Sequence, residues 1–478
     1  MVTVNFYGSP TCLFTSFKDV CLTIMSALKN QELADDFFAD PLHVGKLLLV
    51  DDLDLLSMYN DQTGVYPIGR HAHQITRRYV RRYIGSIANK NVTMGIVDDV
   101  VDQVKVQMDR RVRTIHSPYI AFADCLLNFI TFKPEPFSPD KVCFWKVPFT
   151  YESVMSAPDP VQFFSFLNDV IVEEDTILPD RTTQTVVQEM FGYCFAPTNK
   201  AEAAFFLVGD GSNGKSVLLN ILRAVIGIEN CSAKSIETLT TNRFAASGLI
   251  GKVVNICTEE ESKFLKSDKF KSFISGEETD VERKFGGAFE TKFNIKFLFS
   301  TNDSPSFEGY NWGLFRRLLV IPLTRKIDAA MRDPYITERI IASELCGILK
   351  WALAGTKKLI ASKFTFTESS ATKLALSTVK SSLSSAALYV TENYVDDAEA
   401  FIGCDALYED YENWCKARGK KTVAFYKFFQ DIKQVCTIPL PKNPQWSDGK
   451  MIRGRFLRRK TGAWGEDLDP AGGQEALL

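Results

Sequence analysis

The chain has 478 residues, of which 45% are hydrophobic and 24% are charged, a composition that can bury the cores of about two to four domains. Its formal net charge of −2 excludes a globally basic protein, so any nucleic-acid binding must depend on local basic patches. No apolar run reaches about 18 residues and no signal-peptide pattern opens the chain, which predicts a soluble, cytoplasmic protein with no membrane partner. The 11 cysteines and 4 histidines form no C-x-x-C motif or ligand cluster, so we expect free thiols and no zinc site.

The N-terminal region predicts mixed helices and strands. A helix is expected from Phe14 to Leu33, and an apolar strand over residues 46–50 runs into the acidic stretch Asp51 to Asp54. A strand that ends in Asp-x-Asp resembles the metal-binding carboxylates of a primase or polymerase. A plain acidic turn is favoured, because nucleotidyl transfer needs a third carboxylate and a far larger domain than about 100 residues.

Four arginines then recur at helical spacing, namely Arg77, Arg78, Arg81 and Arg82. Such a stripe lines one face of a helix and is most often a solvated surface, with contact to backbone phosphates as the alternative. Residues 115–200 follow as a mixed, aromatic-rich segment that we expect to pack in front of the next element.

The clearest motif spans residues 205–216. An apolar strand over 205–208 leads into Gly209 to Ser216, which fits G-x-x-x-x-G-K-[ST], and residues 217–226 read as a helix. This strand–loop–helix context favours a phosphate-binding loop for ATP and Mg²⁺ over a chance glycine-rich turn. Lys215 is expected to reach the β- and γ-phosphates and Ser216 to hold Mg²⁺. The predicted nucleotide-binding residues are Gly209, Asp210, Gly211, Ser212, Asn213, Gly214, Lys215 and Ser216.

Two further strands end on polar residues. Residues 251–258 end on Glu259, Glu260 and Glu261, and an acidic triplet alone is usually a solvated face. Because this triplet follows a phosphate-binding loop in the sequence, we interpret it as the site of the catalytic acids. Glu259 would hold Mg²⁺ through water, and Glu260 would activate the attacking water. Residues 296–301 form a second strand that ends on Asn302, which can orient that water or simply form a turn.

Basic residues lie around both strands. A helix over 268–274 precedes a predicted hairpin at Gly286–Gly287, whose arms carry the candidate DNA contacts Arg283, Lys284 and Lys292. Arg316 and Arg317 open a later strand, as a surface pair or as an arginine finger.

The C-terminal third predicts helices and a basic strand. One long helix is expected over residues 335–360, a Ser/Thr-rich connection over 362–385, and two helices over 407–417 and 423–435. A basic strand or wing over 451–460 precedes a disordered tail. It contains the candidate DNA-binding residues Arg453, Arg455, Arg458 and Arg459.

The order of these elements resembles superfamily 3 helicases, and more closely the phage and plasmid primase–helicase family that includes the poxvirus primase–helicase. The likeness is strongest over residues 185–355 and weaker in the last 80 residues. Its matched positions are Gly192, Tyr193, Gly209, Gly211, Asn213, Gly214, Lys215, Ser216, Arg243, Phe244, Leu249, Gly251, Lys252, Glu259, Glu260, Gly276, Arg283, Lys284, Asn302, Pro305, Arg316, Arg317, Glu344, Leu345, Gly347, Ile348, Trp351 and Ala352.

The resemblance implies an α/β fold with an AAA+-like P-loop ATPase core and a mainly parallel sheet, preceded by a mixed helical domain and followed by a small winged-helix-like domain. The expected units are 1–185, N-terminal; 186–360, ATPase core; 361–400, linker and helical connection; 401–465, winged-helix-like; and 466–478, disordered. Relatives that prime carry a primase domain upstream, which this chain starts too late to hold.

The implied function is an ATP-dependent replicative DNA helicase of a phage, virus or mobile element, acting in the host cytoplasm. It would be a ring, most often a hexamer, that moves 3′ to 5′ on single-stranded or forked DNA beside a partner primase or polymerase. Two alternatives stay open: a DNA-binding replication initiator that uses ATP as an assembly switch, and a small-molecule kinase. A kinase would need an acceptor site and would not need the arginine pair after the sensor asparagine.

Overall fold

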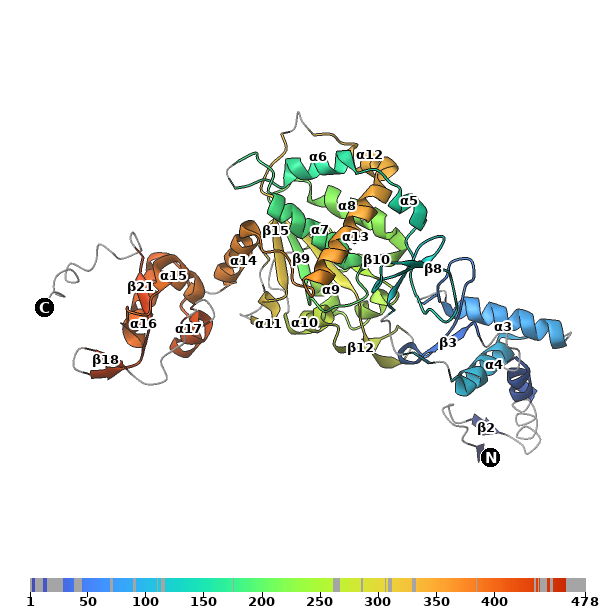
Figure 1. Cartoon of the computed structure of the whole chain (residues 1–478). Helices are drawn as coiled ribbons and strands as arrows, with labels where there is room; N and C mark the ends of the chain where they lie inside the picture. The colour runs from blue at the N-terminus through green and yellow to red at the C-terminus, as the bar shows by residue number, and fades with distance from the viewer. Residues whose placement is uncertain are drawn as a thin grey trace.

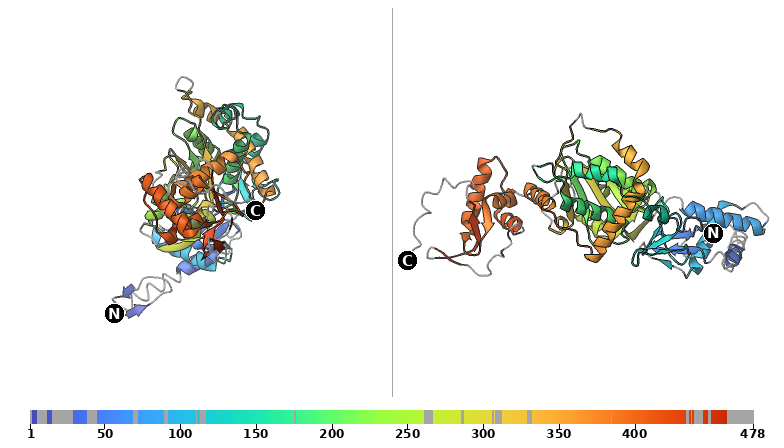
Figure 2. Two further views of the ribbon diagram at one scale, coloured as in Figure 1. Left: turned by 90° about the vertical axis from the view of Figure 1, so that its left-hand side faces the viewer. Right: turned by 45° about the horizontal axis from the view of Figure 1, so that its top comes forward.

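A computed structural model gives the fold of this chain. It describes residues 2–4, 12–14, 29–37, 45–68, 72–88, 92–109, 111–112, 117–174, 176–260, 267–284, 287–305, 307, 312–328, 332–383, 385–433, 436, 438, 445–447 and 450–460. The core that holds the largest sheet lies between an N-terminal part and a C-terminal part, as the views in Figures 1 and 2 show. No helix in the described ranges is both long enough and apolar enough to span a bilayer.

The core is built on a five-stranded sheet in the order β10-β11-β14-β9-β15, in which all neighbouring strands are parallel. Parallel strands are buried on both faces, and these strands are accordingly almost continuous apolar runs. The strands are β9 (Ala204–Val208), β10 (Cys231–Ser232), β11 (Val254–Cys257), β14 (Lys296–Thr301) and β15 (Leu318–Pro322). The prediction of a mainly parallel α/β core is confirmed.

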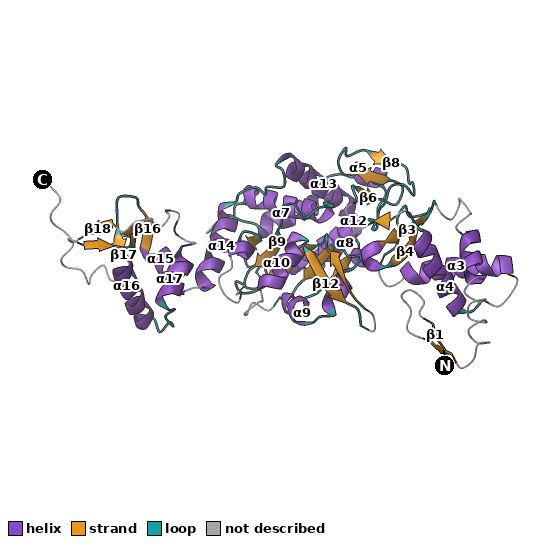
Figure 3. Ribbon diagram, turned by 90° about the horizontal axis from the view of Figure 1, so that it is seen from below, coloured by secondary structure: helices purple, strands orange, loops and turns teal. Residues whose placement is uncertain are grey.

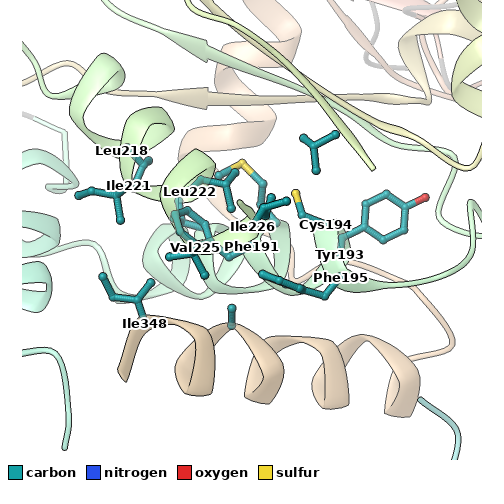
Figure 4. Close-up of a cluster of buried hydrophobic side chains, with 14 of the residues drawn as sticks. Phe191, Tyr193, Cys194, Phe195, Leu218, Ile221, Leu222, Val225, Ile226 and Ile348 are labelled. Carbon is teal, nitrogen blue, oxygen red and sulfur yellow. The ribbon is translucent and has the colours of Figure 1, made fainter. Parts of the chain in front are cut away.

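Alternate side chains of β9 enter two different hydrophobic clusters. Phe205 and Leu207 pack with α7, α8 and α13 on one face, where Figure 4 shows Phe191, Leu222 and Ile348 together. Ala204 and Phe206 pack with α9, α10 and α14 on the other. The covering helices are α6 (Val161–Val170), α7 (Arg181–Phe195), α8 (Lys215–Ile226), α9 (Ile236–Thr241), α10 (Ser267–Ser275), α11 (Trp312–Phe315), α12 (Ile336–Ser343), α13 (Leu345–Ala361) and α14 (Ser370–Leu383), with 3₁₀ turns η2 (Ile228–Asn230) and η3 (Ala245–Leu249).

Helices α7 and α13 approach closely because glycines meet at their contact. A Cβ on Gly192 would lie 2.3 Å from the Thr356 nitrogen, and one on Gly355 would lie 2.3 Å from the Gln188 carbonyl oxygen. The prediction of a single helix over residues 335–360 is wrong, because the segment forms two helices, α12 and α13, that are separated at Glu344. The Glu344 carboxylate instead accepts hydrogen bonds from the first backbone N–H groups of α6, each 2.9 Å long.

The N-terminal part has its own small sheet and core. Strands β4, β3 and β5 lie under α3 and α4, whose valines and tyrosines fill the cluster. The prediction of a helix from Phe14 to Leu33 is wrong at its start, because Phe14 is the last residue of a strand. Residues 29–37 are helical, and residues 15–28 lie outside the described residues. The elements are β1 (Val2–Val4), β2 (Cys12–Phe14), β3 (Leu47–Val50), η1 (Asp51–Leu53), β4 (Leu55–Met58), α3 (Ala72–Ala88), α4 (Met94–Gln107) and β5 (Arg111–Val112).

Residues 117–172 pack on the core that holds the five-stranded sheet. Their buried side chains, including Phe122 and Leu167, belong to the same cluster as Phe205 of β9. The elements are β6 (Tyr119–Ala121), β7 (Leu126–Asn128), β8 (Pro134–Glu135) and α5 (Tyr151–Met155), followed by α6.

A two-stranded hairpin is inserted between β11 and β14. Strand β12 (Glu278–Glu282) pairs with β13 (Ala288–Lys292), and Figure 3 shows β12 beside α10. The predicted hairpin is confirmed in its arms, while Gly286 at its tip lies outside the described residues.

The C-terminal part has a separate core around Tyr389, Trp414 and Phe428. The Ser/Thr-rich connection contains α14, whose Val379 is buried against the far face of the main sheet. The remaining elements are α15 (Ser385–Asn393), β16 (Tyr394–Asp396), β17 (Ile402–Gly403), α16 (Cys404–Ala417), α17 (Phe425–Ile432), β18 (Gln445–Ser447), β19 (Lys450–Ile452), β20 (Gly454–Arg455) and β21 (Leu457–Arg459). Residues 466–478, predicted to be disordered, lie outside the described residues.

One lysine lies in the core. Lys296 at the start of β14 is buried, with its Nζ 2.6 Å from Asn294 Oδ1 and 5.2 Å from the centre of the Tyr193 ring. Burial lowers the pKa of Lys296 to about 7, and the nearby Cys194 thiol opposes that shift.

We predict that Lys296→Met stabilises the protein most near pH 7 and progressively less as the pH rises. Between about pH 7 and pH 10 the unfolded chain binds the extra proton, so wild-type stability should rise by up to about 1.4 kcal/mol per pH unit. Thermal midpoints at pH 7, 8 and 9, with the exposed Lys200→Met as control, test this. A pH-independent difference between Lys296→Met and wild type would contradict it.

Candidate functional site

The phosphate-binding loop joins β9 directly to α8. Gly211 and Gly214 have φ values of +92° and +85°, and Ser212 between them has φ +52°. A Cβ on Gly209 would lie 2.1 Å from Asn213 Nδ2, so only glycine fits there. The loop therefore wraps the N-terminus of α8, whose first N–H groups have no partner within the helix.

Lys215, the first residue of α8, is held by oxygen atoms of the loop and of Asn302. Its Nζ donates to the Gly209 carbonyl, to Asn213 Oδ1 at 2.9 Å and to Asn302 Oδ1 at 3.3 Å. Burial lowers the pKa of Lys215, and the nearby Asp210 carboxylate opposes that shift. The Asn302 contact brings the end of β14 to the loop.

A cavity of about 470 Å³ opens above the loop. It is lined by residues 211–217, by Thr258, Glu259 and Glu260 after β11, and by residues 300–302 after β14. The parallel order of the strands gathers these three segments, because their carboxyl ends share one edge of the sheet.

The two glutamates have different surroundings. Glu259 is exposed at the cavity, whereas Glu260 is buried and its carboxylate accepts from the Ile236 N–H at 3.1 Å, at the start of α9. The Glu260 backbone N–H also donates to the Ser300 carbonyl at 2.9 Å. In this state Glu259 is the carboxylate placed to face a ligand, and Glu260 is tied to the sheet and to α9. Glu261 lies outside the described residues.

The segment after β15 closes the loop from its other side. Leu323 accepts a 2.9 Å hydrogen bond from Asn213 Nδ2, and the Ile327 N–H donates to the Ser212 carbonyl at 3.0 Å. Lys326 Nζ lies 3.6 Å from Asp210 Oδ2. Sequence reasoning missed this segment, because only the parallel pairing of β15 with β9 brings it to the loop.

These residues fit a magnesium–nucleotide complex. The backbone N–H groups of the loop and Lys215 supply donors and positive charge for phosphates. The Ser216 hydroxyl and the Glu259 carboxylate line the same cavity and are oxygen ligands suited to Mg²⁺, which usually keeps water and phosphate oxygens as its other ligands.

The arginine pair lies at the opposite edge of the sheet. The Arg317 carbonyl accepts a hydrogen bond from the N–H of Ala204, the first residue of β9. The phosphate-binding loop, in contrast, follows the last residue of β9. About 16 Å separates the two ends of a five-residue strand. Arg317 is buried and its Nη2 lies 2.6 Å from Glu202 Oε2, while Arg316 is 58% exposed and lies 3.6 Å from the same oxygen. Arg317 therefore anchors the strand, and Arg316 projects to the surface.

The hairpin candidates lie on its described arms. Arg283 stacks its guanidinium 4.7 Å from the centre of the Phe289 ring, where burial lowers its pKa. Lys292 is exposed and lies 3.5 Å from Glu278 across the strand pair, and Lys284 is exposed beside the turn.

The C-terminal arginines do not form one basic surface, which corrects the sequence-based prediction. Arg455 is buried in β20 at 1% exposure, where it pairs with Ile402 of β17. Arg458 pairs with Asp397 at 2.7 Å and Arg459 pairs with Asp410. Arg453 is exposed and stays a candidate DNA contact.

Comparison with known proteins supports a relationship to D5-like viral helicases. A family described as "D5 N terminal like" matches residues 60–172, and one described as "Family of unknown function (DUF5906)" matches residues 207–317. A protein of Acanthamoeba polyphaga mimivirus with the name "Putative helicase" is 25% identical over 158 residues, which are 31% of this chain and 16% of the viral protein.

Solved structures with a similar course of the chain include two of the C-terminal region of NrS-1. Both are apo structures, with TM-scores of 0.44 and 0.43 and sequence identities of 12% and 14%. Each comparison covers 86% of this chain and 96% of that chain.

The two arginines should differ in their effect on stability. Arg317→Ala removes a buried charged contact to Glu202 and should cost about 1.5–3 kcal/mol, whereas Arg316→Ala should change stability by no more than about 0.5 kcal/mol. Thermal unfolding of the two variants measures this. Equal losses would contradict the assignment of Arg317 as the anchor and Arg316 as the surface residue.

Proposed function

We propose that this chain is an ATP-dependent DNA helicase of a virus, phage or mobile element, and that it unwinds duplex DNA during replication. The observation that supports this most is the gathering of Lys215, Glu259 and Asn302 around one 470 Å³ cavity. The similarity to a viral helicase-like protein favours DNA as the substrate over a small molecule.

In this proposal, each group of residues in the cavity has a different role in ATP binding and hydrolysis. Lys215 and the loop N–H groups bind the phosphates, and a nucleotide would replace the oxygens that now hold the Lys215 ammonium group. Mg²⁺ at Ser216 and Glu259 would neutralise phosphate charge. Asn302 would orient the attacking water, and Glu260 would accept its proton after leaving the Ile236 N–H.

The working species in this proposal is a ring, with a hexamer as the expected form. Arg316 is exposed at the edge of the sheet opposite its own loop, so a neighbouring subunit is the partner whose nucleotide it can reach. A guanidinium is permanently charged and can bind a γ-phosphate through two hydrogen bonds. Movement from 3′ to 5′ along single-stranded DNA, and a partner primase or polymerase, complete the proposal by resemblance.

A replication initiator that uses ATP only as an assembly switch is the second candidate. It would bind origin DNA and hydrolyse ATP without processive unwinding. The exposed Arg453 and the hairpin cations Arg283, Lys284 and Lys292 serve either function equally, so the two are separated by strand displacement.

The test is ATP-driven strand displacement on a forked duplex with a 3′ or a 5′ single-stranded tail. Wild type should displace the strand when the 3′ tail is present, and Lys215→Ala should abolish displacement and ATP turnover. Glu259→Gln should still bind nucleotide but hydrolyse it about 100-fold or more slowly, because it lacks the carboxylate charge.

Asp140→Asn is the matched control, since it neutralises an exposed acid away from the cavity and should keep full activity. ATP hydrolysis without displacement on either fork would favour the initiator. If Glu259→Gln hydrolyses ATP at the wild-type rate, Glu259 has no role in the mechanism.

A further inference from the structure

A second and larger cleft separates the N-terminal part from the ATPase core. Its volume is about 1350 Å³, and its walls come from β4, α3 and α4 on one side and from residues 229–234 and 247–252 on the other. The hairpin residues Arg283 and Lys284 reach the same cleft. The two walls approach each other at Gly251, which has φ +76° and where a Cβ would lie 3.3 Å from Ile68 Cγ1.

The charges in this cleft are unevenly distributed. Six lysine and arginine side chains line it against four aspartates and glutamates, which gives a net charge of +2 with His73 neutral. The pKa of His73 is lowered by burial and by Arg77, which keeps the ring uncharged at neutral pH. The aspartates are already paired on the N-terminal wall, Asp98 with Arg77, and Asp54 and Asp102 with Lys105.

The core wall therefore presents cations without carboxylate partners. Lys234 and Lys252 make no ion pair within the described part of the chain, and Lys252 donates to the Glu229 backbone carbonyl at 2.5 Å. Leu53, Ile68 and Ile250 add apolar surface beside them. A positively charged groove is the element that follows the backbone of single-stranded nucleic acid, and Phe144 adds an aromatic ring to the lining of this one.

We propose that this cleft binds single-stranded DNA, with Lys234 and Lys252 in contact with its phosphates. The inference rests on the proposed function, and it adds Lys234 and Lys252 to the hairpin cations Arg283 and Lys284, which line the same cleft. An acidic protein segment is the alternative occupant of the cleft. Such a segment carries negative charge, but it has neither bases nor regularly spaced phosphates.

The cleft is joined to the ATP site by a short series of hydrogen bonds. The buried Asn255 of β11 fixes Lys234, accepting from its N–H and donating to its carbonyl, each at 2.8 Å. Two residues later, the Ile236 N–H binds the Glu260 carboxylate. A phosphate that pulls Lys234 toward the cleft would therefore disturb the contact that holds Glu260 away from the nucleotide.

The direct test is binding of a fluorescent (dT)20 oligonucleotide to the full chain without ATP, titrated between 50 and 300 mM salt. Lys234→Gln/Lys252→Gln should reduce the slope of log affinity against log salt by about 1.4, because each phosphate contact contributes about 0.7. The control Lys133→Gln/Lys200→Gln removes the same charge from exposed positions outside the cleft and should leave the slope unchanged. Equal slopes for both double variants would overturn the proposal.

Photo-crosslinking of wild type with a bromodeoxyuridine oligonucleotide is independent of how the variants fold. Crosslinks within residues 229–252 are expected, and crosslinks confined to residues 394–460 would overturn the proposal. Polyglutamate that binds wild type as tightly as (dT)20 would assign the cleft to an acidic protein instead. Binding in the cleft by a wild type that does not hydrolyse ATP would contradict the proposed function but support the DNA site.

Discussion

A parallel sheet places the carboxyl end of every strand on one edge, and in this protein that constraint gathers all segments of the proposed nucleotide site. β9 lies between β14 and β15, so the loop after β9 has Asn302 on one side and the 323–327 segment on the other. β11 adds Glu259 one strand further away. The four segments are far apart in sequence, and strand order alone brings them together.

The same constraint separates the arginine pair from the loop. β15 runs parallel to β9 with Leu318 beside Ala204, so Arg316 and Arg317 open it at the amino edge. Arg317 uses its position to hold the two strands together through Glu202. Arg316 precedes the same strand, but its side chain points outward and is exposed at the surface. Within one chain, the loop and the exposed arginine therefore lie at opposite ends of β9 and β15.

Local patterns were sufficient for the loop and for the arms of the hairpin, because each depends on residues adjacent in sequence. The parallel core was expected from the family resemblance, since its strands pair across long stretches of the chain. The break at Glu344 could not be predicted, since it depends on the N-terminus of α6 about 180 residues earlier. The burial of Arg455 depends on the pairing of β20 with β17, which a basic stretch of sequence does not reveal. The different surroundings of Glu259 and Glu260 depend on α9. In each case a tertiary contact decides what the local sequence leaves open.

The central claim is that one ATP site is completed by two subunits, and mixing inactive variants tests it most directly. Arg316→Ala and Lys215→Ala should each lack ATPase activity, since an arginine finger contributes about 10³–10⁵ in rate. Combined, they should regain part of the activity, because some interfaces of a mixed ring have an intact loop facing an intact arginine. Normal hydrolysis by Arg316→Ala as a dilute monomer would contradict the claim, because the site would then be complete within one chain.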